Sequence, residues 1–139
     1  MRVILGLVVA AALALGARAQ QAGEQPADPA IQAVIQSQID AFLRDDFETA
    51  FTFASPIIKG IFETPERFGK MVREGYPMVW RPSDVQFMDL REEAGRLYQR
   101  VVVRDAGGAL FALDYQMVET PEGWQINSVQ VLRMPEVGA

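Results

Sequence analysis

The chain has 139 residues, half of them hydrophobic, and its 18 acidic and 13 basic residues give a net charge of −5. This length suits a single domain with a packed core, and the acidic balance makes nucleic acid a poor partner. The chain has no histidine and no cysteine. These absences exclude His-based catalytic triads, ordinary zinc or haem ligation, thiol nucleophiles and disulfides.

The first 19 residues have the pattern of a secretory signal peptide. Arg2 precedes an apolar run over 3–15, and Ala17-Arg18-Ala19 gives a small-x-small cleavage site. The alternative is a membrane anchor, but the run is shorter than the roughly 20 apolar residues that span a bilayer. We therefore expect export to the periplasm or the medium, with no membrane attachment after cleavage. Cleavage removes two arginines and changes the net charge from −5 to −7.

After this segment, the composition predicts a flexible tether and then one domain. Residues 20–27, QQAGEQPA, are small, polar and interrupted by proline, which is typical of a linker. The domain is expected over residues 28–134.

The first half of the domain carries helical spacing and repeated proline starts. We expect helices over 29–44, 47–54 and 65–75, preceded by the capping residues Asp28, Asp46 and Thr64. After Ser55-Pro56, the segment IIKGIF predicts a single turn or an irregular apolar stretch. The segment YPMVWRPSD, residues 76–84, is expected to be extended because Pro82 disfavours helix there.

From Asp84 onward the hydrophobic period changes to two, which indicates β-strands. Short links that contain Gly or Pro separate four predicted strands, over 84–92, 96–105, 109–119 and 124–133. Helices followed by an antiparallel meander predict an α+β fold, with the helices packed on one face of a curved four-stranded sheet.

Two of these strands have apolar residues on both faces. Val101, Val102 and Val103 are consecutive, and the last strand changes from Trp124 and Ile126 on one face to Val129 and Val131 on the other. One explanation is that a dimer partner, a folded-over helix or a ligand covers the second face. The other is a twist or bulge that exchanges the faces partway along the strand.

Several blocks of the sequence resemble the bacterial family described as domain of unknown function 4864. The most specific are TPERFGKMV with the following GYP, and the hairpin from YQMVE to GWQI; the resemblance covers residues 29–133. The layout is similar to the nuclear transport factor 2-like superfamily, which implies a cone formed by a curved sheet around helices. Because that superfamily contains enzymes, ligand binders and interaction modules, the resemblance selects no function.

The resemblance also suggests one kind of catalysis, a carboxylate base opposite a tyrosine donor as in relatives of ketosteroid isomerase. The candidates are Asp114 or Asp89 as base and Tyr98 or Tyr115 as donor. In the segment ALFALDYQM, however, alternation places Tyr115 toward the helices and Asp114 on the opposite face. There, Arg100 or Arg104 of the neighbouring strand is expected to pair with it.

Aromatic residues supply the second kind of candidate site. The ligand-pocket candidates are Phe62, Tyr76, Trp80, Tyr115 and Trp124, and the alternative for each is a place in the core or a dimer contact. No cofactor motif is present, and the paired acidic residues do not match a cation-binding loop, so we expect neither cofactor nor metal.

Together these observations favour a non-enzymatic role. We expect binding of a small apolar molecule or a protein partner, in a homodimer formed through the sheet. The alternative is a His-free isomerase or hydrolase that uses a carboxylate/Tyr pair inside the cone. A carboxylate that points into an open cavity would favour this alternative.

Overall fold

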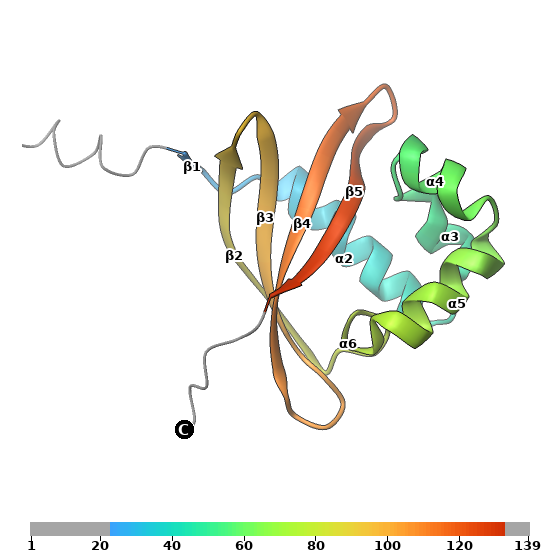
Figure 1. The fold of residues 1–139 in the computed structure, drawn as a ribbon. Coiled ribbons are helices and arrows are strands. Elements are labelled where there is room, and N and C mark those ends of the chain that lie inside the picture. Colours follow the sequence, from blue (N-terminus) through green and yellow to red (C-terminus); the bar gives the residue numbers. More distant parts are fainter. Residues whose placement is uncertain (1–22, 133–139) are drawn as a thin grey trace, which may run out of the picture.

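The computed structural model describes residues 23–132, so the predicted signal peptide over 1–19 lies outside the described residues. The protein is α+β, with helices that cover one face of an antiparallel sheet (Figure 1). The helices are α2 (Pro29–Leu43), α3 (Phe47–Thr52), α4 (Pro56–Phe62), α5 (Pro65–Gly75) and α6 (Pro77–Trp80). The strands are β1 (Glu24–Gln25), β2 (Asp84–Glu93), β3 (Arg96–Arg104), β4 (Leu110–Thr120) and β5 (Gly123–Leu132). In this part of the chain no helix is both long and apolar enough to cross a membrane.

The predicted helix starts are confirmed by side-chain caps. Asp28 accepts a hydrogen bond from the amide of Ala30, Asp46 from that of Thr49, and Thr64 from that of Arg67. Each cap satisfies one backbone N–H that the first turn leaves without a partner.

Two segments are helical where the sequence predicted otherwise. α4 is a full seven-residue helix rather than a single turn, because Ser55 caps it and Gly60 does not end it. Residues 77–80 form the short helix α6 rather than an extended segment. Pro77 fits the first position of this helix, and Pro82 lies beyond its end, so neither proline opposes it.

The sheet has five strands, not four, in the order β1-β2-β3-β4-β5. The additional strand, β1, lies inside the predicted tether, where Glu24 pairs with Arg91 and Gln25 with Leu90. The amide of Glu92 also donates to the carbonyl of Gly23 at 2.7 Å. This pairing uses the backbone, which is why two exposed polar residues gave no strand pattern.

A bulge explains the apparent change of face in β5. Gln116 pairs with Ser128 but Met117 pairs with Ile126, so Asn127 is an extra residue. Ile126 and Val129 therefore lie on the same face of the sheet. Their cross-strand partners on that face are Met117 and Tyr115, respectively. Of the two alternatives, the bulge is confirmed for this strand.

The core lies between this face and the helices. Ile31, Ile35 and Phe42 of α2 pack in one cluster with sheet residues that include Leu113 and Tyr115. The segment after α3 fastens the helices to β5, because the amide of Ile126 donates to the carbonyl of Phe53 and its carbonyl accepts from the amide of Ser55. This short parallel bridge holds the helical layer against the edge strand.

Candidate functional site

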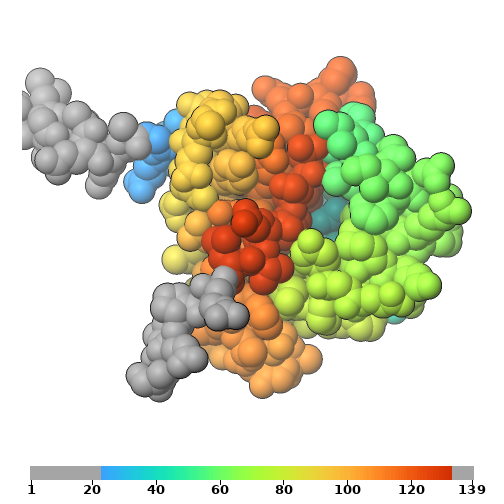
Figure 2. Space-filling model, in the orientation of Figure 1, coloured from blue at the N-terminus to red at the C-terminus, as the bar shows by residue number. Residues whose placement is uncertain are grey.

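A cavity of about 330 Å³ lies between the helices and β5. In Figure 2, a hollow separates the red of β5 from the green of the helices, and the teal of α2 is visible at its bottom. Thirteen residues line the cavity, and none of them is acidic or basic. They are Gln38, Phe42, Ala54, Ile58, Phe62, Phe68, Met71, Val72, Tyr76, Val79, Ile126, Ser128 and Val129.

Aromatic rings form the deeper wall of this cavity. The ring of Phe68 lies 5.9 Å from that of Phe42, 5.2 Å from that of Phe51 and 5.9 Å from that of Phe62, measured between centroids. Contacts of this kind favour defined tilted geometries. The rings of Phe42, Phe62 and Phe68 therefore connect α2, α4 and α5 into one wall, opposite Ile126 and Val129 of β5. Phe51 of α3 packs against Phe68 but does not line the cavity.

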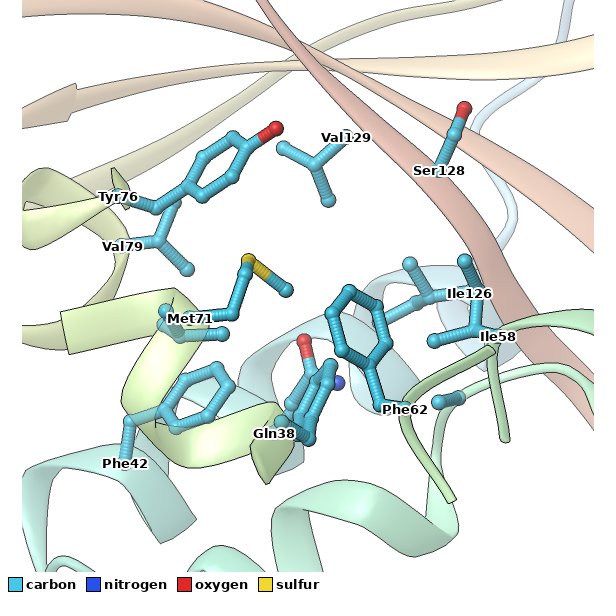
Figure 3. A pocket seen from close by; sticks show the side chains of 13 residues that line it. Gln38, Phe42, Ile58, Phe62, Met71, Tyr76, Val79, Ile126, Ser128 and Val129 are labelled. Carbon is cyan, nitrogen blue, oxygen red and sulfur yellow. The ribbon is translucent and has the colours of Figure 1, made fainter. Parts of the chain in front are cut away.

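Three lining side chains carry polar atoms, and they point in different directions (Figure 3). Ser128 directs its hydroxyl away from the cavity, and Tyr76 extends its hydroxyl toward Val129 at the rim. Gln38 lies at the bottom, is only 3 % exposed, and donates from Nε2 to the carbonyl of Ala50 at 3.1 Å. The polar chemistry of the interior thus comes from the amide of Gln38.

The five predicted pocket residues occupy different places. Phe62 and Tyr76 line the cavity. Trp80 lies outside it, where its Nε1 donates to Asp45 and the guanidinium of Arg81 lies 4.2 Å from the ring centroid. Trp124 lines a separate depression beside the β4–β5 hairpin. Tyr115 is fully buried in the core.

Asp114 lies on the face of the sheet away from the helices, where it pairs with Arg100 in the register. It is 4 % exposed, and its carboxylate accepts hydrogen bonds from both Arg91 and Arg100. Burial acts to raise the pKa of Asp114, but the hydrogen bonds from Arg91 and Arg100 outweigh it and hold the pKa below its usual value. Arg104, the other predicted partner, donates instead to the carbonyl of Gly108.

The remaining catalytic candidates do not come together with Asp114 at a cavity. Asp89 is exposed on β2, and Tyr98 lies beneath the guanidinium of Arg91 on the outer face. Burial raises the pKa of Tyr115, and its hydroxyl has no hydrogen-bond partner within residues 23–132. Among residues 23–132, the structure therefore brings no carboxylate/Tyr pair into the cavity.

Gln38 is absent from the predicted site residues, although its position in α2 carries a sequence signal. Ile31, Ile35, Gln38 and Phe42 follow helical spacing on one face of α2, and Gln38 is the polar member of that apolar series. A polar residue at such a position is buried and needs a partner. Met71 and Val129 gave no comparable signal, because core and cavity residues share the same periodic pattern.

The comparisons with known proteins agree with the resemblance at family level. No curated protein and no solved structure matches the chain. The family model described as Domain of unknown function (DUF4864) matches residues 24–139. Because this match spans most of the chain, including every strand and helix described above, the protein belongs to the DUF4864 family.

Proposed function

We propose that this protein binds a small apolar molecule in the cavity between the helices and β5, and that it is not an enzyme. One observation carries the proposal: a cavity of about 330 Å³ has uncharged, mostly apolar walls and a single amide at its bottom. Ligand sites are typically apolar hollows of about 300–1,000 Å³ with few polar groups. The cavity lies at the small end of that range.

The same walls argue against acid–base catalysis. A general base must lie within hydrogen-bond reach of the substrate, and none of the described residues that line the cavity is a carboxylate. Asp114, the principal candidate, is held ionised by two arginines on the other face of the sheet. The isomerase or hydrolase alternative therefore has no observation in its favour.

A substitution at the rim tests the proposal. Met71 lines the cavity and is half-buried, so Met71→Trp should fill the entrance with an indole ring. We expect the wild-type chain to bind the uncharged dye N-phenyl-1-naphthylamine with increased fluorescence. The Met71→Trp variant should lose most of this response.

Lys70→Trp is the matched control, because Lys70 is the exposed neighbour of Met71 on α5 and does not line the cavity. This variant should bind the dye like the wild type. If both variants retain the dye response, or if the wild-type chain shows none, the cavity is not the binding site.

Three broader features belong to the same proposal. Export would place the binding activity in the periplasm or the medium, and N-terminal sequencing of the mature protein tests it. A curved sheet with helices on one face supports assignment to the nuclear transport factor 2-like superfamily. Homodimerisation through the outer face of the sheet is the third feature.

A further inference from the structure

The side-chain amide of Gln38 forms a hydrogen bond through its nitrogen but none through its oxygen within the described residues. Its Nε2 donates to the carbonyl of Ala50 at 3.1 Å. Because a carbonyl oxygen can only accept, the amide nitrogen must face Ala50, and Oε1 must lie on the other side. Figure 3 shows this oxygen directed toward Met71 and Phe62 across the cavity.

Within the described residues no hydrogen-bond donor pairs with this oxygen, and the Gln38 side chain is only 3 % exposed. The oxygen itself is not among the fully buried atoms that lack a partner, so it remains open to the cavity. Because the oxygen faces the cavity without a protein donor, a ligand that brings an O–H or N–H to this point can donate to it in place of water. Gln38 Oε1 is therefore a hydrogen-bond acceptor that faces the cavity from otherwise apolar walls.

The charge of the walls restricts the ligand further. None of the thirteen lining side chains is ionised, so a charged group inside would lose its hydration without gaining a counter-ion. A carboxylate would also bring a second acceptor against Gln38 Oε1. We infer that the cavity selects an uncharged apolar molecule with one hydrogen-bond donor, an alcohol or an N–H compound, which donates to Gln38 Oε1. This inference depends on the proposed function.

Three probes of similar size test the selection in the purified wild-type chain. 1-Octanol and heptyl methyl ether have the same atoms but differ in the O–H donor, and octanoate carries a negative charge. Binding is measured by amide chemical-shift titration. Because one hydrogen bond contributes about 1 kcal/mol, we expect the alcohol to bind about three- to tenfold more tightly than the ether. Octanoate should bind most weakly.

Two variants assign the effect to one residue. Gln38→Met keeps the length of the side chain but removes the acceptor, so it should bind the alcohol and the ether with equal affinity. Gln36→Met makes the same change on another face of α2, where Gln36 donates to Asp40. This control should retain the wild-type preference. If Gln38→Met does not fold, comparing alcohol and ether binding by the wild-type chain still tests whether the cavity prefers a ligand with a hydrogen-bond donor.

The outcomes separate the two proposals. Equal binding of alcohol and ether by the wild-type chain, or tightest binding by octanoate, would overturn the inference and leave apolar ligand binding intact. A preference for the alcohol that persists in Gln38→Met would overturn the role of Gln38. Absence of binding by all three probes would overturn the proposed function together with the inference.

Discussion

Asp114 illustrates how a carboxylate can be buried in this protein without serving as a base. Arg91 donates to it at 2.7 Å and 3.1 Å, and Arg100 donates at 2.6 Å and 3.2 Å. Each of the two carboxylate oxygens accepts a hydrogen bond from both arginines, and these bonds keep the carboxylate charged. The cluster of Arg91, Arg100 and Asp114 is therefore structural, and it fixes β2, β3 and β4 relative to one another.

Removing this carboxylate should destabilise the fold. Breaking a buried pair from one side costs about 3–5 kcal/mol, because the remaining charge is left uncompensated. Arg91 and Arg100 are partly exposed and can recover some hydration, so Asp114→Ala should lower the free energy of unfolding by about 2–3 kcal/mol. Urea denaturation measures the change. Asp89→Ala, at an exposed carboxylate of β2, should change it by less than about 0.5 kcal/mol.

The lowered pKa of Asp114 also predicts a pH dependence. A carboxylate whose pKa is lower in the folded state stabilises the protein above its unfolded pKa of about 3.9. That contribution is lost as the pH falls through the folded pKa, which lies lower. The stability difference between wild type and Asp114→Ala should therefore be full at pH 6 and shrink below about pH 4. A difference that stays constant down to pH 2 would show that charge is not its source.

Tyr115 offers the opposite case, a buried polar group that no protein atom satisfies. Its hydroxyl is fully buried and has no hydrogen-bond partner in the part of the chain that the structure describes. Tyr115→Phe keeps the ring and removes this desolvated hydroxyl, so the free energy of unfolding should rise by about 1 kcal/mol. Thermal and urea denaturation check this. A loss of stability would indicate that an ordered water binds the hydroxyl.

Two glycines inside helices provide a matched test at the level of the element. A methyl group at Gly69 of α5 would lie 2.6 Å from Cγ and Cδ1 of Phe47, whereas one at Gly60 of α4 would meet nothing within 4 Å. Alanine is favoured over glycine in a helix by up to about 1 kcal/mol. We expect Gly60→Ala to stabilise the protein by about that amount. Gly69→Ala should destabilise it, because the Phe47 ring must move.

Equilibrium urea denaturation of both variants measures these changes. Stabilisation by both would mean that Phe47 has room to shift without cost. Destabilisation by Gly60→Ala would mean that α4 is less regular than described.

The elements that the sequence predicted correctly have local causes. The helix starts could be predicted from Asp28, Asp46 and Thr64, because a capping side chain binds a backbone amide only two or three positions away. The alternation in β4 assigned Tyr115 and Asp114 to opposite faces because it depends on neighbours along one strand. α6 and β1 were missed because a four-residue helix and a two-residue strand are too short for any period, and backbone pairing with distant residues determines β1.

At the scale of the whole molecule, the helix-then-meander order predicted α+β architecture, but the cavity could not be predicted. Its walls come from α2, α4, α5, α6 and β5, and its volume depends on how these elements are spaced. The Asn127 bulge, which places Val129 toward the cavity, results from pairing between two strands. Phe62 and Tyr76 could be chosen as aromatic candidates, yet nothing local distinguished them from Trp80.

The dimer prediction also belongs to this scale. Val102, Ala112 and Leu132 are paired in one row across the outer face of the sheet. This apolar row supports self-association, and Val102→Lys should convert a dimer to a monomer by placing a charge in it. Light scattering at micromolar concentration measures the mass. Glu66→Lys on exposed α5 is the control and should stay dimeric; a monomeric wild type would refute the interface.

The hydrogen bond that Ser55 Oγ donates to Asn127 Oδ1 joins residues 72 positions apart, beside the backbone bridge that holds the helices on β5. A nascent chain leaves the ribosome from its N-terminus, so α2 to α5 emerge long before the strand that covers them. Closing so long a loop is entropically costly and slows folding. We therefore expect the cavity to be among the last features to form during synthesis. Until β5 docks, the helices expose apolar surface, which makes a nascent chain prone to aggregate.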